Sequence, residues 1–142
     1  RHFLTKHQPS KKDTYILNIE SIGAGNLHYL TAEGMLHRTP AAPLLLKAAE
    51  DAAKQHNITP AEMRALPTAA HIPHHLGFPA LTIMRLGPGG LPQSWNQVED
   101  HLTKIDEESI AEAAVYAHAL IQSLDGQCAP QAPRHTADKN QD

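Results

Sequence analysis

The stretch TYILNIESIGAG, residues 14–25, decides the fold of this chain. From Tyr15 to Ile22 apolar residues fall on both sides of the backbone, which is typical of an inner strand of an α/β sheet. The strand carries a carboxylate, Glu20, just before a Gly-x-Gly turn. A buried lone charge is costly unless it is paired or bound to a metal ion. Glu20 is therefore either a site residue or a carboxylate at an exposed strand end, paired with a nearby Lys or Arg.

Outward from this strand, the pattern predicts further strands and helices. Leu27–Thr31 is expected to form a short strand, and Ala80–Leu86 a second central one. A helix is expected to open at Pro43, since proline suits the first helical turn, and to stop at Asn57. Thr59–Glu62 has the spacing of a capping box and predicts a short turn of helix. This alternation predicts an α/β domain, a layered mixed sheet flanked by helices.

The last helix has the clearest boundaries. Asp106 is a suitable N-cap, Ile105 and Ile110 occupy the positions of a hydrophobic staple, and Gly126 follows the helix. Five residues are expected to form its core face: Ile110, Ala114, Ala117, Ile121 and Leu124. We expect residues 1–126 to form one domain and residues 127–142 to form a disordered polar tail.

Composition excludes several classes of protein. The chain of 142 residues suits one domain, and its net charge of −3 with scattered Lys and Arg gives no basic face for nucleic acid. No apolar run approaches the roughly 18 residues of a membrane span. The single cysteine, Cys128, excludes an intramolecular disulfide and leaves both the redox compartment and the localisation unknown. The chain begins at Arg1 without a signal-peptide pattern, and residues 1–7 are typical of the end of a helix, so we expect a fragment or a processed product.

Three histidines gather in one short segment. His71, His74 and His75 are spaced so that imidazoles three or four residues apart could share a metal ion. The alternative is that they are loop histidines exposed beside a pocket, because Pro73 interrupts any helix there. The glycine-rich segment 87–90 lacks the Lys-Ser/Thr of a phosphate-binding loop, which excludes it as a nucleotide site.

Three segments together resemble the C-terminal half of a known family. The segments are Tyr15–Gly23, Leu76–Leu81, and Trp95–Asp100 with the Ile105-Asp106 pair that follows. In order and placement they resemble the zinc-dependent aminopeptidase family that includes glutamate carboxypeptidase II and, as a non-catalytic relative, the transferrin receptor. The resemblance runs from about Tyr15 to Leu124.

The resemblance implies a metal role for Glu20, as a terminal ligand to one of two zinc ions. In such enzymes the paired metals polarise the peptide carbonyl and activate a bridging water, while a separate Glu moves protons. Asn96 stands where the family has the histidine ligand to the other zinc ion, and an amide oxygen is a weaker zinc ligand than imidazole. Ala69 stands where the family usually has an aspartate lining the site. His71 or His101 is the alternative ligand that the sequence offers.

The family's other ligands and its catalytic Glu-Glu pair correspond to sequence upstream of this chain, so the catalytic residues are unknown here. We expect that the chain alone binds no zinc stably and hydrolyses no peptide bond, while the parent protein acts on a peptide substrate. The alternative is a non-catalytic interaction module with a degenerate peptidase fold.

The resemblance also implies a substrate pocket. Its wall would come from the loops Pro67–Leu76 and Gly87–Asn96, with His71, His74 and Trp95 as substrate-binding residues. For Trp95 the alternative is packing against the last helix. Without the upstream strands the edge of the first strand is expected to be open, which predicts a homodimer through that edge.

Overall fold

The computed structural model describes residues 2–65, 67–93, 95, 97–98 and 100–128 of the chain. Among these residues, five strands form one mixed sheet. The strands are β1 (Ile16–Glu20), β2 (Asn26–Glu33), β3 (Thr39–Pro40), β4 (Thr59–Met63) and β5 (Ala80–Leu86). The sheet is flanked by helices, which confirms the predicted α/β class.

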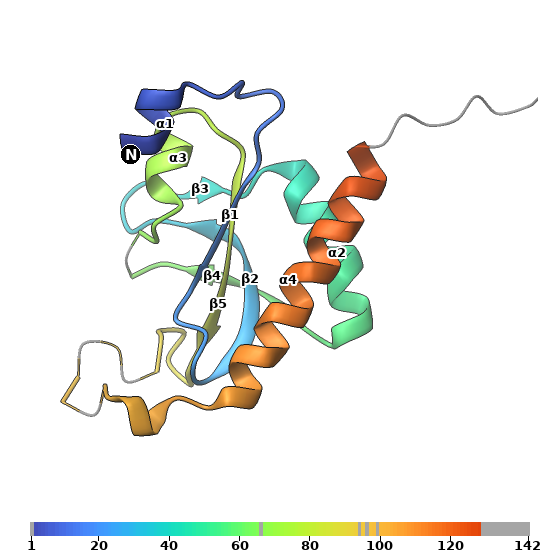
Figure 1. Ribbon diagram of the computed structural model, residues 1–142. Helices are drawn as coiled ribbons and strands as arrows, with labels where there is room; N and C mark the ends of the chain where they lie inside the picture. Colours follow the sequence, from blue (N-terminus) through green and yellow to red (C-terminus); the bar gives the residue numbers. More distant parts are fainter. Residues whose placement is uncertain (1, 66, 94, 96, 99, 129–142) are drawn as a thin grey trace, which may run out of the picture.

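Strand β5 connects the two parts of the sheet (Figure 1). It pairs in parallel with β1 and antiparallel with β2, and β2 pairs with β4 in parallel and with β3 antiparallel. Because β1 and β5 run in the same direction, with Glu20 opposite Met84, both strands end at the same edge of the sheet. Within the described residues β1 pairs with β5 alone and lies at the edge of the sheet, so it is not the inner strand that its apolar pattern suggested.

The helices form two groups, as Figure 1 shows. They are α1 (His2–His7), α2 (Pro43–His56), α3 (His71–His75) and α4 (Glu107–Cys128). α2 and α4 pack against each other on one face of the sheet, and α1 lies close to α3 on the other side. α2 begins at Pro43 and stops before Asn57, whose left-handed φ of 54° caps the helix, as predicted.

The residues of β5 alternate between these two faces. Leu81 and Ile83 point into the apolar core under α2 and α4, where Tyr116 is fully buried and donates a hydrogen bond from its hydroxyl to the carbonyl of Ala49 at 3.0 Å. Burial raises the pKa of the Tyr116 phenol far above its usual range. We call this side the helix face.

Arg85 is the polar exception on the helix face. Its side chain is 5% exposed, and its guanidinium donates to the carbonyl oxygens of Gly25 at 2.6 Å and Ser109 at 2.9 Å. It also pairs with the half-exposed carboxylate of Glu112. These bonds fasten both the turn after β1 and the first turn of α4 to β5.

The opposite side of the sheet, which we call the site face, carries a smaller apolar cluster and several buried polar groups. Leu30, Met63, Met84 and Leu86 form the cluster. Thr82, which lies between Leu81 and Ile83 in sequence, is 2% exposed and points to this side, where it accepts a hydrogen bond from Asn18 of β1.

A bulge interrupts β2. Leu30 pairs with Ala61 and Ala32 pairs with Glu62, so Thr31 is an extra residue on β2. Its hydroxyl donates to the carbonyl of Ala61 at 3.1 Å. Beyond this bulge Glu33, the last residue of β2, contacts Thr82 and thus lies on the site face.

Three local predictions were wrong. Thr59–Met63 is strand β4 and not a helical turn, because pairing with β2 outweighs the local capping pattern. His71–His75 is helical and not a loop, because Pro73 lies in the first turn, where a missing N–H costs little. The predicted core face of α4 is wrong at three of its five residues, because Ala114 is exposed and Ile110 and Ile121 are 39% and 47% exposed. Ala117 is buried and Leu124 packs against the core, as expected, and the helix also buries Ala113, Tyr116 and Leu120. The helix turns its Tyr116 side to the core, because the ring is buried there and its hydroxyl finds a hydrogen-bond acceptor on α2.

The ends of α4 differ in how well they were predicted. Asp106 caps the helix as expected, because its carboxylate accepts bonds from the backbone N–H groups of Glu108 and Ser109. At the other end the helix passes Gly126 and reaches Cys128, so two residues assigned to the polar tail are helical. Residues 129–142 of that predicted tail lie outside the described residues.

In the part of the chain that the structure describes, no helix is both long and apolar enough to cross a membrane. This agrees with the absence of a membrane-spanning pattern in the sequence.

Candidate functional site

Glu20 lies at the carboxyl end of β1, half-buried on the site face. Its Oε2 accepts two hydrogen bonds of 3.2 Å, one from Asn18 Nδ2 and one from the backbone N–H of Ala69. The chain leaves the strand through Ser21, which has a left-handed φ of 51°, and through Gly25. A Cβ at Gly25 would stand 2.7 Å from the carbonyl oxygen of Leu86, so only glycine fits this turn. Glu20 is therefore held by the protein and does not point into open solvent.

A buried carboxylate that the sequence did not reveal lies behind Glu20. Glu33 is 4% exposed, and its Oε2 accepts bonds from the hydroxyls of Thr68 and Thr82. These two hydroxyls are 2.9 Å apart, and the Thr68 hydroxyl also accepts from the backbone N–H of Ala70. The strand predicted at Leu27–Thr31 ends before Glu33, so no pattern in the sequence predicts that this carboxylate is buried.

His74 faces the same carboxylate. Its Nε2 lies 3.9 Å from Glu33 Oε1, and its side chain is 10% exposed. Burial lowers the pKa of His74; the negative charge of Glu33 opposes this shift, and His71 adds to it. His74 is thus a buried partner of Glu33, while its predicted role in substrate binding remains a proposal.

The other two histidines of α3 point elsewhere. His71 and His75 are exposed, with ring centres 6.3 Å apart in a stacked arrangement, and they line a separate pocket together with Ile72 and Leu76. α3 therefore splits the three-histidine segment between the interior and the surface.

Two adjoining pockets lie beyond Glu20. The smaller, of about 50 Å³, is lined by Glu20, Thr68 and Met84 among others, and it has room for one or two water molecules. The larger, of about 310 Å³, lies next to it, and both share Ser21, Pro92 and Trp95. A volume of this size suits an amino-acid side chain or a small ligand.

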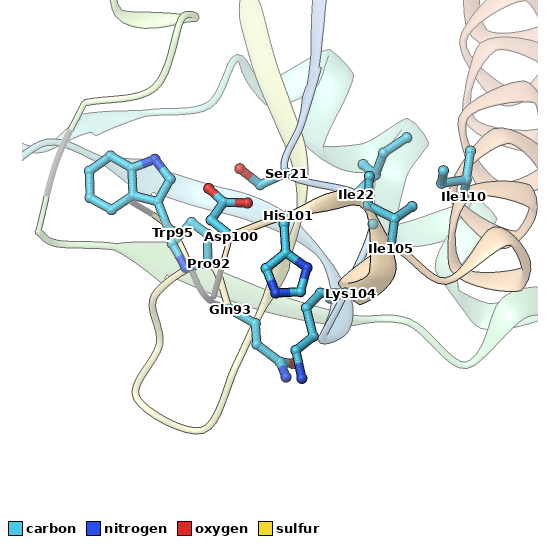
Figure 2. A pocket seen from close by; sticks show the side chains of 12 residues that line it. Ser21, Ile22, Pro92, Gln93, Trp95, Asp100, His101, Lys104, Ile105 and Ile110 are labelled. Carbon is cyan, nitrogen blue, oxygen red and sulfur yellow. The ribbon is translucent and has the colours of Figure 1, made fainter. Parts of the chain in front are cut away.

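Figure 2 shows how the larger pocket is built. The indole of Trp95 lies at one side, and three isoleucines, Ile22, Ile105 and Ile110, lie at the other. Between them stand polar groups of both charges, from Asp100, His101 and Lys104. The pocket thus combines apolar walls with a few polar and charged groups, which is typical of a ligand site.

The described residues do not fit a zinc centre. One carboxylate, Glu20, has an oxygen already occupied by two N–H donors, whereas a catalytic zinc ion usually needs three protein ligands. In the described ranges no group of three or more His, Cys, Asp or Glu side chains is placed to hold a metal ion. Neither His71 nor His101 joins Glu20 in such a group; His101 bonds to Thr103 through Nδ1 at 2.7 Å. Asn96 lies outside the described residues.

Solved structures of other proteins resemble the fold of this chain. A search of the solved structures finds a 5′-methylthioadenosine/S-adenosyl homocysteine nucleosidase from Campylobacter jejuni, with a TM-score of 0.51 and 13% identity, covering 88% of this chain and 73% of that one. It also finds a mutant futalosine hydrolase from Helicobacter pylori strain 26695, with a TM-score of 0.48 and 8% identity, covering 89% and 73%. The first likeness shows a shared fold alone, and the second supports nothing further.

Among curated proteins there is no significant match. The sequence profile of peptidase family M28, in contrast, matches residues 1–121. The peptidases of this family are generally zinc-dependent. Because the match covers most of the 142 residues, and agrees with the three segments on which the resemblance rests, the chain belongs to peptidase family M28.

Proposed function

We propose that this chain forms the C-terminal part of an M28 peptidase-type domain. It supplies sheet, a helical layer, one metal-binding carboxylate and part of the wall of a peptide-binding pocket. The observation that carries the proposal is Glu20: its Oε2 is fixed by Asn18 and Ala69, and its carboxylate lies at a strand end beside two pockets. Such an arrangement is expected where open sheets collect site residues.

The chain alone is then an incomplete site. With Glu20 as its one carboxylate for zinc, Ala69 in place of an aspartate and Asn96 in place of a histidine, we expect neither stable zinc binding nor hydrolysis of peptide bonds. In the parent protein, the remaining ligands of two zinc ions and a catalytic Glu would come from family positions that have no counterpart in this chain.

The larger pocket is the proposed place for a substrate side chain. Trp95 is 40% exposed and lines both pockets, so its indole offers an apolar surface next to Glu20. His71 lines a different pocket, on α3. Of the residues proposed to bind substrate, Trp95 has the strongest support.

Zinc retention and peptidase activity test the proposal together. The full chain is incubated with zinc, passed through gel filtration and analysed for bound metal, and it is assayed with a panel of aminoacyl p-nitroanilides. We expect no retained zinc and no turnover. The double variant Ala69→Asp, Asn96→His should retain zinc, because it adds a carboxylate and an imidazole to the carboxylate of Glu20. Adding Glu20→Gln to that variant should abolish the gain.

Two results would contradict the proposal. Metal-dependent turnover by the unaltered chain would show that the site is complete. Zinc retention in the double variant that persists after Glu20→Gln would show that Glu20 is not a ligand.

The second candidate function is a non-catalytic interaction module. It is favoured by Ala69, whose methyl group replaces a charged side chain while its backbone N–H occupies Glu20. The residues that precede Arg1 in the parent gene discriminate between the two candidates: an intact His-x-Asp and Glu-Glu favour an enzyme.

An open edge at β1 also supports the proposed homodimer. The outward edge of β1 is unpaired in the described part of the chain, and Ile19 is 44% exposed. Antiparallel pairing of two such edges would satisfy the free backbone groups. Light scattering should give twice the chain mass, and Ile19→Lys should restore the single mass, because an edge lysine opposes pairing. A single mass at all concentrations for the unaltered chain would exclude the dimer.

A further inference from the structure

Glu33 is buried more completely than Glu20, yet it lines neither pocket beside Glu20. A carboxylate that is 4% exposed carries a large desolvation cost, and replacing such groups by apolar ones is often neutral or stabilising. Stability alone is therefore a poor reason for a carboxylate at this position. Its contacts suggest another.

One chain of hydrogen bonds runs from Glu33 along the sheet to Glu20. The hydroxyl of Thr82 donates to Glu33 Oε2 at 3.3 Å and accepts from Asn18 Nδ2 at 3.2 Å. The same Asn18 Nδ2 donates to Glu20 Oε2 at 3.2 Å. An amide nitrogen carries two hydrogens, so it can serve both acceptors at once.

A second chain runs through the loop before α3. The hydroxyl of Thr68 donates to Glu33 Oε2 and accepts from the N–H of Ala70 at 3.1 Å. Holding Thr68 and Ala70 fixes the residue between them, Ala69, whose N–H donates to Glu20 Oε2. Both chains begin at one oxygen of Glu33 and end at one oxygen of Glu20.

The direction of these bonds depends on the carboxylate. An ionised carboxylate only accepts hydrogen bonds. The Thr82 hydroxyl therefore donates its single hydrogen to Glu33 directly, or to Thr68, which in turn donates to Glu33. Its lone pairs are then left for Asn18, which must present its NH₂ group and not its carbonyl. The same NH₂ group is what Glu20 accepts from.

We propose that Glu33 is a positioning residue for Glu20: as the acceptor at the start of both chains, it sets the orientation of the Asn18 amide and of the Ala69 N–H. Glu20 Oε2 thereby accepts from two fixed donors, which sets the orientation of the whole carboxylate and so the direction of its other oxygen. The inference rests on the proposed function only where Glu20 is a ligand; the positioning itself needs no metal.

Glu33 also contacts His74, so anchoring α3 is the competing explanation. The two explanations differ in what removing Glu33 does to Asn18. If Glu33 positions Glu20 through the two chains, then Glu33→Leu should release both Asn18 and Ala69, Thr82→Val should release Asn18 while Ala69 stays protected, and Thr68→Val should release Ala69. If Glu33 only anchors α3, then Glu33→Leu should leave Asn18 protected, because the Thr82 hydroxyl still accepts from its amide.

Hydrogen exchange of the full chain, followed by NMR, is the test. The reporters are the side-chain NH₂ of Asn18 and the backbone N–H of Ala69, and the N–H of Ile83 in β5 reports on global opening. Glu33→Leu should speed exchange of both reporters about five- to tenfold, the equivalent of roughly one lost hydrogen bond each. Thr82→Ser keeps the hydroxyl and should exchange like the unaltered chain, whereas Thr82→Val should not.

The threonine variants keep the inference testable if Glu33→Leu does not fold. Unchanged exchange of Asn18 in Thr82→Val and of Ala69 in Thr68→Val would overturn it. An equal rise at Asn18, Ala69 and Ile83 in every variant would also overturn it, because it would mark loss of the whole fold. Because no metal is involved, failure here leaves the zinc test of Glu20 unaffected.

Discussion

Thr82 and Ile83 are neighbours on β5, almost equally buried at 2% and 0% exposure, and they face opposite sides of one sheet. Ile83 lies among apolar side chains under α2 and α4, where the stabilising quantity is the area removed from water. Thr82 lies among hydroxyls, an amide and a carboxylate, where the requirement is that each donor meets an acceptor. The helix face therefore stabilises the fold by burying apolar area, and the site face fixes the orientation of polar side chains.

The largest effect is expected on the helix face. Ile83→Ala should lower the free energy of unfolding by about 2–5 kcal/mol, because it removes buried methyl groups and leaves a cavity. Urea unfolding followed by circular dichroism measures this as a lower midpoint with an unchanged slope. The matched control is Val115→Ala on α4, where the side chain is 55% exposed and little change is expected. Equal losses from both variants would contradict the comparison.

A smaller loss is expected one residue away. Thr82→Val keeps the shape of the side chain and removes its hydroxyl, which costs about 1–2 kcal/mol because Asn18 Nδ2 loses an acceptor. Thr82→Ser, which retains the hydroxyl, should recover most of the hydrogen-bond contribution. The same urea titrations apply. A loss as large as that of Ile83→Ala would mean that the site face also depends mainly on packing.

The smallest effect is a dependence on pH that is confined to the site face. Burial lowers the pKa of His74, with Glu33 opposing and His71 adding to the shift. The folded state thus binds its proton less readily than the unfolded state, so this contribution to stability is present above about pH 6.5 and is lost as the pH falls through the folded pKa. As the pH falls from about 7 to about 5, the urea midpoint of the unaltered chain should fall further than the urea midpoint of His74→Asn. His75→Asn, at an exposed position, should behave like the unaltered chain.

The sequence predicted the helix face better than the site face. β5 and α2 have long apolar patterns with clear boundaries, Pro43 and Asn57 among them, and such patterns bury the same surface in any arrangement of the domain. In α4 the apolar pattern placed Ile110 and Ile121 in the core, whereas the helix buries Tyr116, because a ring with a bonded hydroxyl depends on where α2 lies. Rotation of a helix is set by its neighbours.

The site face needed information from far along the chain. Glu20 stood out because it breaks an apolar strand, and the family resemblance implied its metal role; the structure places it next to Ala69. Glu33 was missed because its partners, Thr68 and Thr82, are 35 and 49 residues away in sequence. β4 was missed for the same reason, since its pairing with β2 outweighs the local pattern of Thr59–Glu62.

The extra residue at Thr31 has a consequence for how this site could arise or be lost. Side chains alternate along a strand, so regular alternation from Leu30 through Thr31 would turn Glu33 to the helix face, where the carboxylate would meet hydrocarbon. The bulge takes up Thr31 as one unpaired residue, and Glu33 therefore stays opposite Met63 on the site face. A deletion of the Thr31 codon would restore regular pairing and keep the carboxylate on this side, whereas an inserted codon that no second bulge absorbs would turn it toward α2.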